Sequence, residues 1–376
     1  MEYLTLKDIA LINMGQSPDS KTYNEEKEGI PFYQGKSDFG KINPIPRVWC
    51  SNPIKIAEKD DILISVRAPI GDTNIATEKC CIGRGLASIR PLNENVNKKY
   101  LYYLLNSKYK ELNKFGTGST FKAITKENLC NLKCAEIPDI KEQIEVVKKL
   151  DNVSQIIEIK KKQLEELSII IKSQFVEMFE SGNYPKEELG KLCDVRDGTH
   201  DSPKYLEESG YKFITSKNII NNEIDFSEVK YISKQDYDKF NTRSKVNYGD
   251  ILMPMIGTIG KPMIVNIPDD EIDFAIKNVA LIKFLDNSQV TNIYIKNLLD
   301  SDYFENAILQ NKRGGTQKFI ALSDIRKMQI EIPPIELQNK FADIVKQIDK
   351  QKFESVIKAE KEIEKIQKNI YYKWGR

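Results

Sequence analysis

A long internal repeat constrains this chain more than any other feature. Residues 61–71 (DILISVRAPIG) return as residues 250–260 (DILMPMIGTIG), and residues 137–143 (IPDIKEQ) return as residues 332–338 (IPPIELQ). A period near 190 residues is too long for a solenoid, so the repeating unit is a globular domain followed by a helix. Two similar modules in one chain can read two similar features of one partner. Duplex DNA, with its own local two-fold symmetry, is the first candidate for that partner.

The composition predicts a soluble protein with room for two domains. The chain has 376 residues, 30% of them charged, and a mean hydropathy of −0.47. Residues 1–8 lack the basic and apolar stretches of a signal peptide, and no apolar run reaches the length of a membrane span. We therefore expect a cytoplasmic protein with no membrane partner.

The net charge is a mild objection to nucleic-acid binding. Lysine and arginine number 57 against 55 acidic residues, whereas many nucleic-acid binders are globally basic. Phosphates respond to local basic patches, however, and a large helix-bearing protein can carry such patches at near-zero net charge. The objection does not exclude DNA.

Cysteine spacing does not predict a metal site. Of the six cysteines, Cys130 and Cys134 are four apart, the neighbouring Cys80 and Cys81 would face opposite ways on a strand, and His200 is the only histidine. Structural zinc needs four ligands, usually in two closely spaced pairs. We expect no metal and reduced thiols.

The repeat divides the sequence into four segments. Residues 1–138 and 183–333 combine short apolar runs with many glycine and proline turn signals, which is typical of α+β domains. In the first domain, strands are expected near residues 61–66 and 80–89, with short helices at 98–106 and 125–132. Residues 139–182 and 334–376 are long, charged and helical, and residues 181–185 (SGNYP) end the first of them.

Both helical segments carry a coiled-coil seam of apolar residues at alternating three- and four-residue steps. The seam of the first segment is interrupted at Lys160. A helix of 40 residues spans roughly 60 Å, too long to be covered by one small domain. We therefore expect the two helices to pack antiparallel, which relates the domains by a pseudo-two-fold axis; the alternative is that each lies on its own domain. The seam residues are Val146, Leu150, Val153, Ile157, Leu164, Leu167, Ile171 and Met178, then Phe341, Val345, Ile348, Val356, Ala359, Ile363, Ile366 and Ile370.

A series of motifs, in the same order in both halves, resembles the specificity subunits of type I restriction–modification systems along essentially the whole chain. In the first half the motifs are residues 15–18 (GQSP), 31–36 (PFYQGK), 61–71, 83–87 (GRGLA) and 118–124 (GSTFKAI). In the second they are residues 197–203 (DGTHDSP), 213–219 (FITSKNI), 250–260, 277–280 (KNVA) and 314–320 (GGTQKFI). The second half replaces the GQSP opening with DGTH, so the two half-sites should differ.

The resemblance implies a division of labour. Residues 1–138 and 183–333 would be target recognition domains, each binding one half of a split, asymmetric DNA site. The helices would set the spacer and dock methyltransferase subunits, two of which are expected. Those partners would carry S-adenosylmethionine and methylate adenine, and a restriction subunit would use ATP with Mg²⁺. This chain would carry no cofactor and would not be an enzyme alone.

Several polar residues in these motifs are candidate DNA contacts. Arginine and lysine can grip guanine or phosphate, and glutamine or asparagine can pair with adenine. For Arg67 and Arg84 the alternative is bracing a loop by bonding carbonyls. For the glycine-rich stretches the alternative is turn formation. The candidates are Gln34, Lys36, Arg67, Arg84, Thr120, Lys122, Thr199, His200, Lys217, Asn218, Lys277, Asn278, Arg313, Thr316, Gln317 and Lys318.

His200 is also a candidate catalytic residue, because histidine titrates near neutrality. Its other readings are turn chemistry with Asp197 and Thr199, or a DNA contact. The sequence lacks the Asn/Asp-Pro-Pro-aromatic element of an adenine methyltransferase, a phosphate-binding GxxxxGK[ST] loop and a nuclease signature. The competing function from another class is a coiled-coil scaffold with protein-binding domains.

Overall fold

The structure is a computed structural model that describes residues 4–115, 123–134, 136–180, 182–207, 209–220, 222–257, 259–286, 288–301, 304 and 319–374, with backbone alone for 367–374. The chain forms two compact units, residues 1–158 with 361–376, and residues 159–360. These units divide both long helices between them, so the segment boundaries expected from the sequence stay a prediction. Within the described residues, no helix is both long and apolar enough to cross a membrane.

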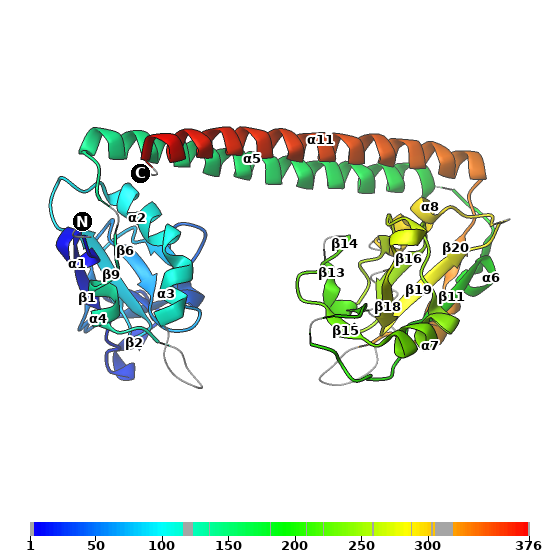
Figure 1. Ribbon diagram of the computed structural model, residues 1–376, viewed down its shortest axis with the longest axis horizontal. Coiled ribbons are helices and arrows are strands. Elements are labelled where there is room, and N and C mark those ends of the chain that lie inside the picture. Colours follow the sequence, from blue (N-terminus) through cyan, green and yellow to red (C-terminus); the bar gives the residue numbers. More distant parts are fainter. Residues whose placement is uncertain are drawn as a thin grey trace. The chain divides into compact units, whose positions relative to one another are not determined.

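The first unit contains two sheets (Figure 1). One has the strand order β1 (Ala10–Met14), β9 (Leu86–Pro91), β6 (Ile62–Ser65), β7 (Thr73–Ile75). The other has the order β2 (Tyr23–Asn24), β4 (Val48–Cys50), β3 (Ile30–Tyr33), β8 (Cys80–Ile82), β5 (Ile56–Ala57). The helices are α1 (Leu6–Ile9), α2 (Lys98–Ser107), α3 (Tyr109–Phe115), α4 (Lys126–Cys130) and the start of α5 (Ile140–Phe179), with 3₁₀ turns η1 (Ser20–Thr22) and η2 (Lys36–Asp38).

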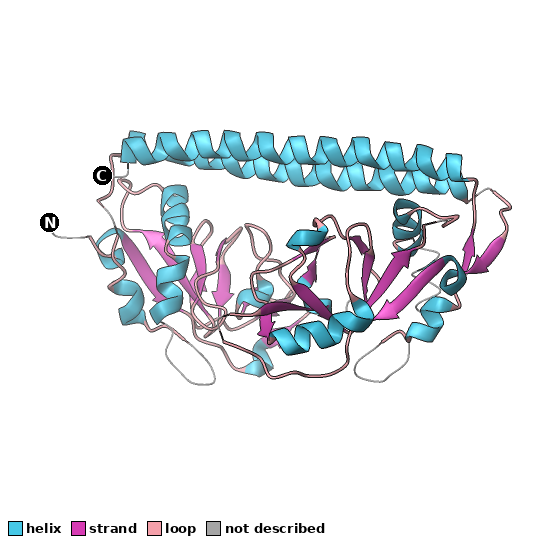
Figure 2. Ribbon diagram, turned by 45° about the vertical axis from the view of Figure 1, so that its right-hand side comes forward, coloured by secondary structure: helices cyan, strands magenta, loops and turns pink. Residues whose placement is uncertain are grey.

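The second unit repeats this plan (Figures 1 and 2). Its main sheet has the order β11 (Cys193–Asp197), β19 (Val279–Phe284), β16 (Ile251–Pro254), β17 (Met263–Ile264). A second sheet has the order β15 (Lys230–Ile232), β12 (Tyr211–Thr215), β18 (Phe274–Lys277). Two antiparallel two-stranded sheets pair β10 (Lys186–Glu188) with β20 (Gln329–Glu331) and β13 (Ile219–Ile220) with β14 (Glu223–Ile224). The helices are α6 (Leu189–Leu192), α7 (Lys234–Ser244), α8 (Asn292–Leu299), α10 (Leu322–Arg326) and the start of α11 (Ile335–Trp374), with 3₁₀ turns η3 (Ser216–Asn218) and η4 (Asp269–Glu271).

The two main sheets correspond strand for strand, and each unit also has one parallel pair, β3 with β8 and β12 with β18. The prediction of two repeated α+β domains is therefore confirmed. The short helices expected at 98–106 and 125–132 are α2 and α4.

The repeated DIL motif forms a strand that is buried on both faces. In β6, Ile62 and Ile64 point into one core while Leu63 points into another. In β16, Ile251 and Met253 likewise face one core and Leu252 a second. Full burial of such a side chain contributes about 1.5–3 kcal/mol. The motif recurs because the central strand of each unit must be apolar on both sides.

The aspartate that opens this motif holds the turn before the strand. Asp61 accepts a 2.9 Å hydrogen bond from the Glu58 amide, and Asp250 accepts a 2.7 Å bond from the Asn247 amide. Asp61 is paired with Arg90, whereas Asp250 is paired with Lys283. Burial raises the pKa of the Asp250 carboxyl even though the lysine opposes the shift.

A buried glutamine in each half ties a long helix to its globular domain. Gln143 accepts a 2.7 Å hydrogen bond from the Asn97 amide, at the N-terminal cap of α2, and donates to the carbonyls of Asn95 and Pro138. The later Gln338 does the same at α8, accepting from the Thr291 amide at 2.8 Å. The IPxxxxQ repeat is therefore the junction between domain and helix.

Within the second unit, the end of α5 and the beginning of α11 lie side by side and antiparallel (Figures 1 and 2). Their apolar residues join the core of the unit, so these helix ends pack both on each other and on their own domain. The ring of Phe341 on α11 lies 5.5 Å from that of Phe175 and 5.4 Å from that of Phe179 on α5. Both phenylalanines of α5 also contact Tyr294 of α8.

The buried stripes follow most of the predicted seam but depart from it twice. Ile157 is 39% exposed, and the half-buried position beside it is Ile156. Val356 is 37% exposed, and its neighbours Ser355 and Ile357 are both half-buried. Helical phase, rather than the identity of the apolar residue, decides the buried face at both places. Ile366 is half-buried, and the side chain of Ile370 lies outside the described residues.

The first unit anchors α5 through Tyr103. Its hydroxyl donates a 2.6 Å hydrogen bond to Asp151, which also pairs with Lys99 at 2.7 Å. Burial, and then the bond to Asp151, raises the pKa of Tyr103 to about 12.

We expect this anchor to be lost in strong alkali. An unfolded tyrosine ionises near pH 10, so the unfolded chain releases this proton first, and stability falls as the pH rises from about 10 through about 12. Tyr103→Phe should therefore show a smaller alkaline loss than the wild type. Urea unfolding at about pH 9 and about pH 11 measures it, and equal losses in both proteins would contradict the role of the anchor.

Candidate nucleic-acid interface

In each unit, one glycine lets the loop after the first sheet strand cross a neighbouring loop. The Gly15 amide donates to the Leu86 carbonyl at 2.9 Å, and the Gln16 amide donates to Ile82 at 3.0 Å. In the second unit the Gly198 amide donates to Val279 at 2.9 Å, and the Thr199 amide donates to Ile276 at 3.0 Å. A Cβ on Gly15 would lie 2.2 Å from the Gly83 carbonyl oxygen, and one on Gly198 would lie 2.4 Å from the Ile276 oxygen. Only glycine fits these crossings.

Further backbone hydrogen bonds bring three more strand ends next to the crossing at Gly15. In the first unit the Val66 amide donates to Gly85, the Gly85 amide donates to Gln34, and the Ile124 amide donates to Val66. We call residues 15–17, 34–36, 66–67 and 83–85 the first loop cluster.

The second unit repeats two of these bonds: the Met255 amide donates to Asn278, and the Ile320 amide donates to Met255. In addition, the Ser216 hydroxyl donates to the Asn278 carbonyl at 3.0 Å. Residues 198–200, 215–218, 255–256 and 276–278 are the second loop cluster. The two clusters are equivalent, because four of their backbone hydrogen bonds correspond one for one.

The first loop cluster brings together four of the sequence candidates, Gln34, Lys36, Arg67 and Arg84, and all four are exposed. The ammonium of Lys36 lies 2.7 Å from the Asp72 carboxylate. The backbone around Arg84 is held by the Ser17 hydroxyl, which accepts from the Arg84 amide at 3.4 Å. Three cationic side chains, Lys36, Arg67 and Arg84, thus belong to one loop cluster, and the Asp72 carboxylate pairs with the first of them.

The second loop cluster brings together Thr199, His200, Lys217, Lys277 and Asn278 with Asn218. His200 is exposed and hydrogen-bonded on both ring nitrogens, at 2.9 Å to Asp197 and 2.7 Å to Asn278. The Thr199 hydroxyl accepts from the Asp201 amide, and the Lys277 ammonium donates to Ser202 at 2.6 Å.

The buried Asn218 differs from its neighbours in this cluster. Its amide oxygen accepts from the Thr215 amide and hydroxyl, and its amide nitrogen donates to the Asp225 carbonyl. Capping of η3 therefore accounts for the amide oxygen, and the Asp225 carbonyl for the amide nitrogen, while Lys217 beside it is exposed. Whether either residue touches DNA stays a prediction.

Some candidates lie outside the described residues, namely Thr120, Lys122, Arg313, Thr316, Gln317 and Lys318. The residues that follow them are described. Ala123 bridges to Arg67 of the first loop cluster, and Phe319 bridges to Ile256 of the second. Both glycine-rich motifs thus lead into the loop clusters along the chain.

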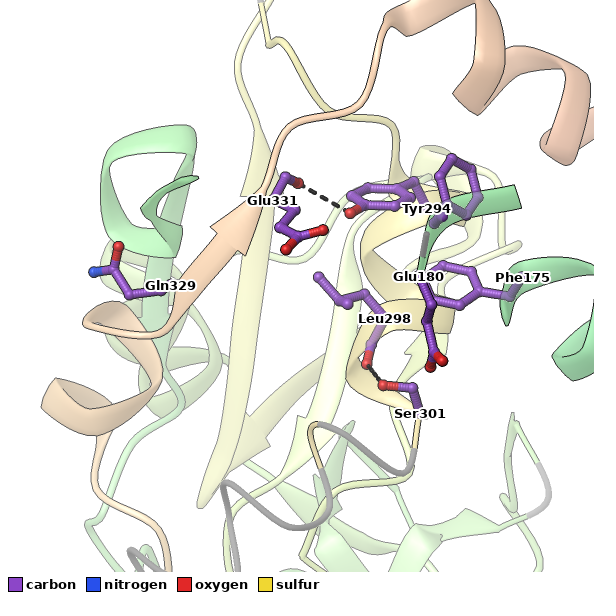
Figure 3. A pocket seen from close by; sticks show the side chains of 8 residues that line it. Phe175, Glu180, Tyr294, Leu298, Ser301, Gln329 and Glu331 are labelled. Carbon is purple, nitrogen blue, oxygen red and sulfur yellow. Dashed lines mark hydrogen bonds between the residues drawn. The ribbon is translucent and has the colours of Figure 1, made fainter. Parts of the chain in front are cut away.

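A cavity of about 310 Å³ lies elsewhere in the second unit (Figure 3). Its walls include Phe175, Tyr294, Glu180 and Glu331, and the Tyr294 hydroxyl donates to the Glu331 carbonyl at 2.9 Å. The Ser301 hydroxyl at its edge donates to the Leu298 carbonyl, so it is not activated by a base. None of the sequence candidates lines this cavity.

The thiols and acids of the described residues do not assemble into a reactive group. No cluster of three or more His, Cys, Asp or Glu side chains there could hold a metal ion. All six cysteines are free, and burial raises the pKa of Cys80 and of Cys193 to about 12. Thiols with such raised pKa values stay protonated and are poor nucleophiles.

Beside the second loop cluster, the sequence indicated only a role in a turn for Asp197 and did not indicate Arg243. Asp197 is 6% exposed and accepts from both His200 and Arg243 of α7. The Asp-Gly-Thr-His spacing was a signal for Asp197. Arg243 comes from a helix 46 residues along the chain, and no local pattern marks it.

The crossing glycine is open to a direct test. Gly15→Ala should destabilise the first unit by about 2–4 kcal/mol, because backbone must move to admit the methyl group. Gly35→Ala is the matched control in the same cluster, since a Cβ there meets nothing within 4 Å and the backbone is extended. Urea unfolding of both variants measures the difference. Equal stability of the two variants would show that the crossing tolerates a side chain.

Comparison with known proteins places these features in a family. The family model described as "Type I restriction modification DNA specificity domain" matches residues 1–168 and again residues 183–365. The type I restriction enzyme MjaIX specificity subunit of Methanocaldococcus jannaschii is 25% identical over 96% of this chain and 89% of its own length. A protein named provisionally as the MjaX specificity subunit of a type I restriction enzyme, from the same organism, is 46% identical. That match spans 42% of this chain and only 36% of the relative, little more than a third of its length.

The fold agrees with that assignment. The crystal structure of a type I restriction–modification system S subunit from M. genitalium aligns over 97% of this chain and 92% of its own, with a TM-score of 0.50 and 15% sequence identity. The chain belongs to the type I restriction modification DNA specificity domain family, and it carries two copies of the domain. The resemblance seen in the sequence is confirmed, as is the prediction that this chain is a specificity subunit and not itself an enzyme.

Proposed function

We propose that each loop cluster binds one half of a bipartite, asymmetric DNA site. The observation that carries the proposal is the duplicated set of hydrogen bonds that gathers exposed polar and basic side chains at equivalent strand ends. Phosphate contacts by Lys36 and Lys217 would position the duplex, and Arg67, Arg84, Lys277 and Asn278 would read base edges. The two clusters present different side chains, so the half-sites would differ in sequence.

The long helices would set the distance between the half-sites and dock methyltransferase subunits. Each helix has 40 residues, about 60 Å at 1.5 Å per residue. On the part of α5 in the second unit, Ile159, Ile169 and Ile170 remain exposed, which supports a protein partner on this surface. Two methyltransferase subunits would supply S-adenosylmethionine and methylate adenine, and a restriction subunit would supply ATP and Mg²⁺ chemistry.

Methylation profiling tests this function. Genomic DNA from cells carrying this chain with its neighbouring methyltransferase would be compared with DNA from cells lacking this chain. The expected result is a split motif with methyladenine in both halves that disappears on deletion. Modification that persists unchanged would favour the scaffold function. Binding to duplex DNA that weakens steeply with salt is a second discriminator, because a protein scaffold does not require it.

Helix length offers a prediction about the spacer. Deleting one matched heptad from both α5 and α11 removes roughly 10 Å of helix and keeps the buried stripe in phase. The methylated motif should then lose roughly three base pairs of spacer, at 3.4 Å per base pair. The same profiling reads the result, and deletion from one helix alone is the control. An unchanged spacer would rule out the helices as the ruler.

A further inference from the structure

The second loop cluster contains His200, whose protonation state fixes the orientation of the neighbouring Asn278 side-chain amide. The His200 ring is 62% exposed, but both its nitrogens are engaged. Nε2 lies 2.9 Å from a carboxylate oxygen of Asp197, which is buried and also paired with Arg243. Nδ1 lies 2.7 Å from the amide oxygen of Asn278. The backbone of Asn278 is held by Ser216, Met255 and Thr199, so its side chain is presented from a fixed point.

This arrangement requires hydrogens on both ring nitrogens, because both face oxygen acceptors. An imidazolium ring meets that requirement. A neutral ring that keeps its hydrogen on Nε2 for Asp197 has a bare Nδ1, which can only accept. The Asn278 amide can then satisfy Nδ1 only after a half turn that brings its nitrogen to the ring. Loss of one proton from His200 therefore exchanges the oxygen and nitrogen of the Asn278 amide.

We propose that His200 is a positioning residue that decides whether Asn278 presents a donor or an acceptor to the DNA. With the imidazolium, the amide nitrogen faces outward and suits an acceptor on a base edge, such as guanine O6 or thymine O4. With the neutral ring, the amide oxygen faces outward and suits an amino group, adenine N6 or cytosine N4. One recognised position thus depends on pH. The inference rests on the proposed DNA function of the second loop cluster.

The charged groups around His200 limit the effect of its protonation to the side chain of Asn278. Asp197 at the end of β11 is shared between His200 and Arg243 of α7. Two other charged side chains near the ring have partners of their own: Asp201 pairs with Lys239 at 3.0 Å, and Lys277 donates to the Ser202 hydroxyl. Lys217, also in the cluster, is exposed.

The first loop cluster has no histidine–asparagine pair at the equivalent positions. The first half-site therefore serves as an internal control. The equivalent crossing glycines are Gly15 and Gly198. The residues that precede them are Met14 and Asp197, and Ser17 stands where His200 stands. Gly85 takes the place of Asn278, since each accepts the matching bond from Val66 or Met255. Only one half of the split site should therefore respond to pH.

The test uses the full chain in complex with its methyltransferase subunits. Duplexes randomised in both half-sites are selected for binding at about pH 5.5 and about pH 8, the range in which histidine changes charge, and are then sequenced. The wild-type complex should change its base preference at one position of one half-site. His200→Gln should show the preference of about pH 8 at both values, because the glutamine amide donates to Asp197 and accepts from Asn278 as a neutral histidine does.

A second variant tests the amide itself. Asn278 has a positive φ of 55°, which glycine adopts freely, so Asn278→Gly removes the amide without backbone strain. It should lower discrimination at that one position by about tenfold and leave the other half-site unchanged. A pH-independent preference in the wild type, or unchanged discrimination in Asn278→Gly, overturns the inference. If the wild type selects no split sequence at all, the proposed DNA function itself has failed.

Discussion

Replacing Phe341 by alanine should destabilise the second unit by about 3–5 kcal/mol, the usual cost of removing a buried phenylalanine. Phe341 is fully buried between Phe175 and Phe179, at ring separations of 5.5 and 5.4 Å. Edge-to-face aromatic pairs add about 0.5–1.5 kcal/mol each beyond burial. These rings hold α5, α11 and the globular part of the second unit in one core, so their loss should loosen all three together.

Phe353→Ala on the same helix is the matched control, because Phe353 is 67% exposed and its truncation leaves no cavity. Hydrogen exchange of peptides from residues 159–360, followed through a urea series, measures both variants. We expect protection in α5, α8 and the start of α11 to fall in Phe341→Ala and to stay near the wild type in Phe353→Ala. Similar loss in both variants would mean that the aromatic cluster is not the core of the unit.

The repeat predicted the fold class because two independent copies of one pattern limit the alternatives. The strand expected at residues 61–66 is β6, and the helices around positions 98 and 125 are α2 and α4. The seam was less predictable, since apolar residues stand side by side at Ile156 and Ile157 and the sequence does not say which faces inward. At Val356 the helical phase places Ser355 and Lys352 on the half-buried stripe instead.

The candidate site, too, could be predicted from the sequence only in part. Motifs close to glycines pointed to Gln34, Arg67 and Arg84, and the strand ends bring these residues into one cluster although they are up to 50 positions apart. Contacts made across the fold left no local signal. The ion pair between Asp197 and Arg243 and the bond between His200 and Asn278 depend on how β11, α7 and β18 pack, which only the structure supplies.

The junction glutamines carry the second large effect. Gln338 is fully buried, accepts from the Thr291 amide at 2.8 Å, and donates at 2.9 Å to the carbonyls of Gln289 and Pro333. Gln338→Leu keeps most of the volume but leaves the Thr291 amide and the Gln289 and Pro333 carbonyls without this partner. The bond to Pro333 is buried and the other two are partly buried. Because a fully buried group without a partner costs about 1–3 kcal/mol and partly buried groups cost less, the second unit should lose roughly 3–5 kcal/mol.

Two further variants separate this effect from a general loss of helix stability. Gln347→Leu changes an exposed glutamine on the same helix and should leave the stability within about 0.5 kcal/mol of the wild type. Gln143→Leu breaks the equivalent junction of the first unit, where the Asn97 amide and the Asn95 and Pro138 carbonyls lose their partner. Because the two junctions correspond bond for bond, each substitution should weaken its own unit by a similar amount, as urea unfolding with hydrogen exchange would report. Wild-type stability in Gln338→Leu would mean that water or a shifted backbone replaces the lost bonds. The glutamine would then not be the reason that the IPxxxxQ motif recurs.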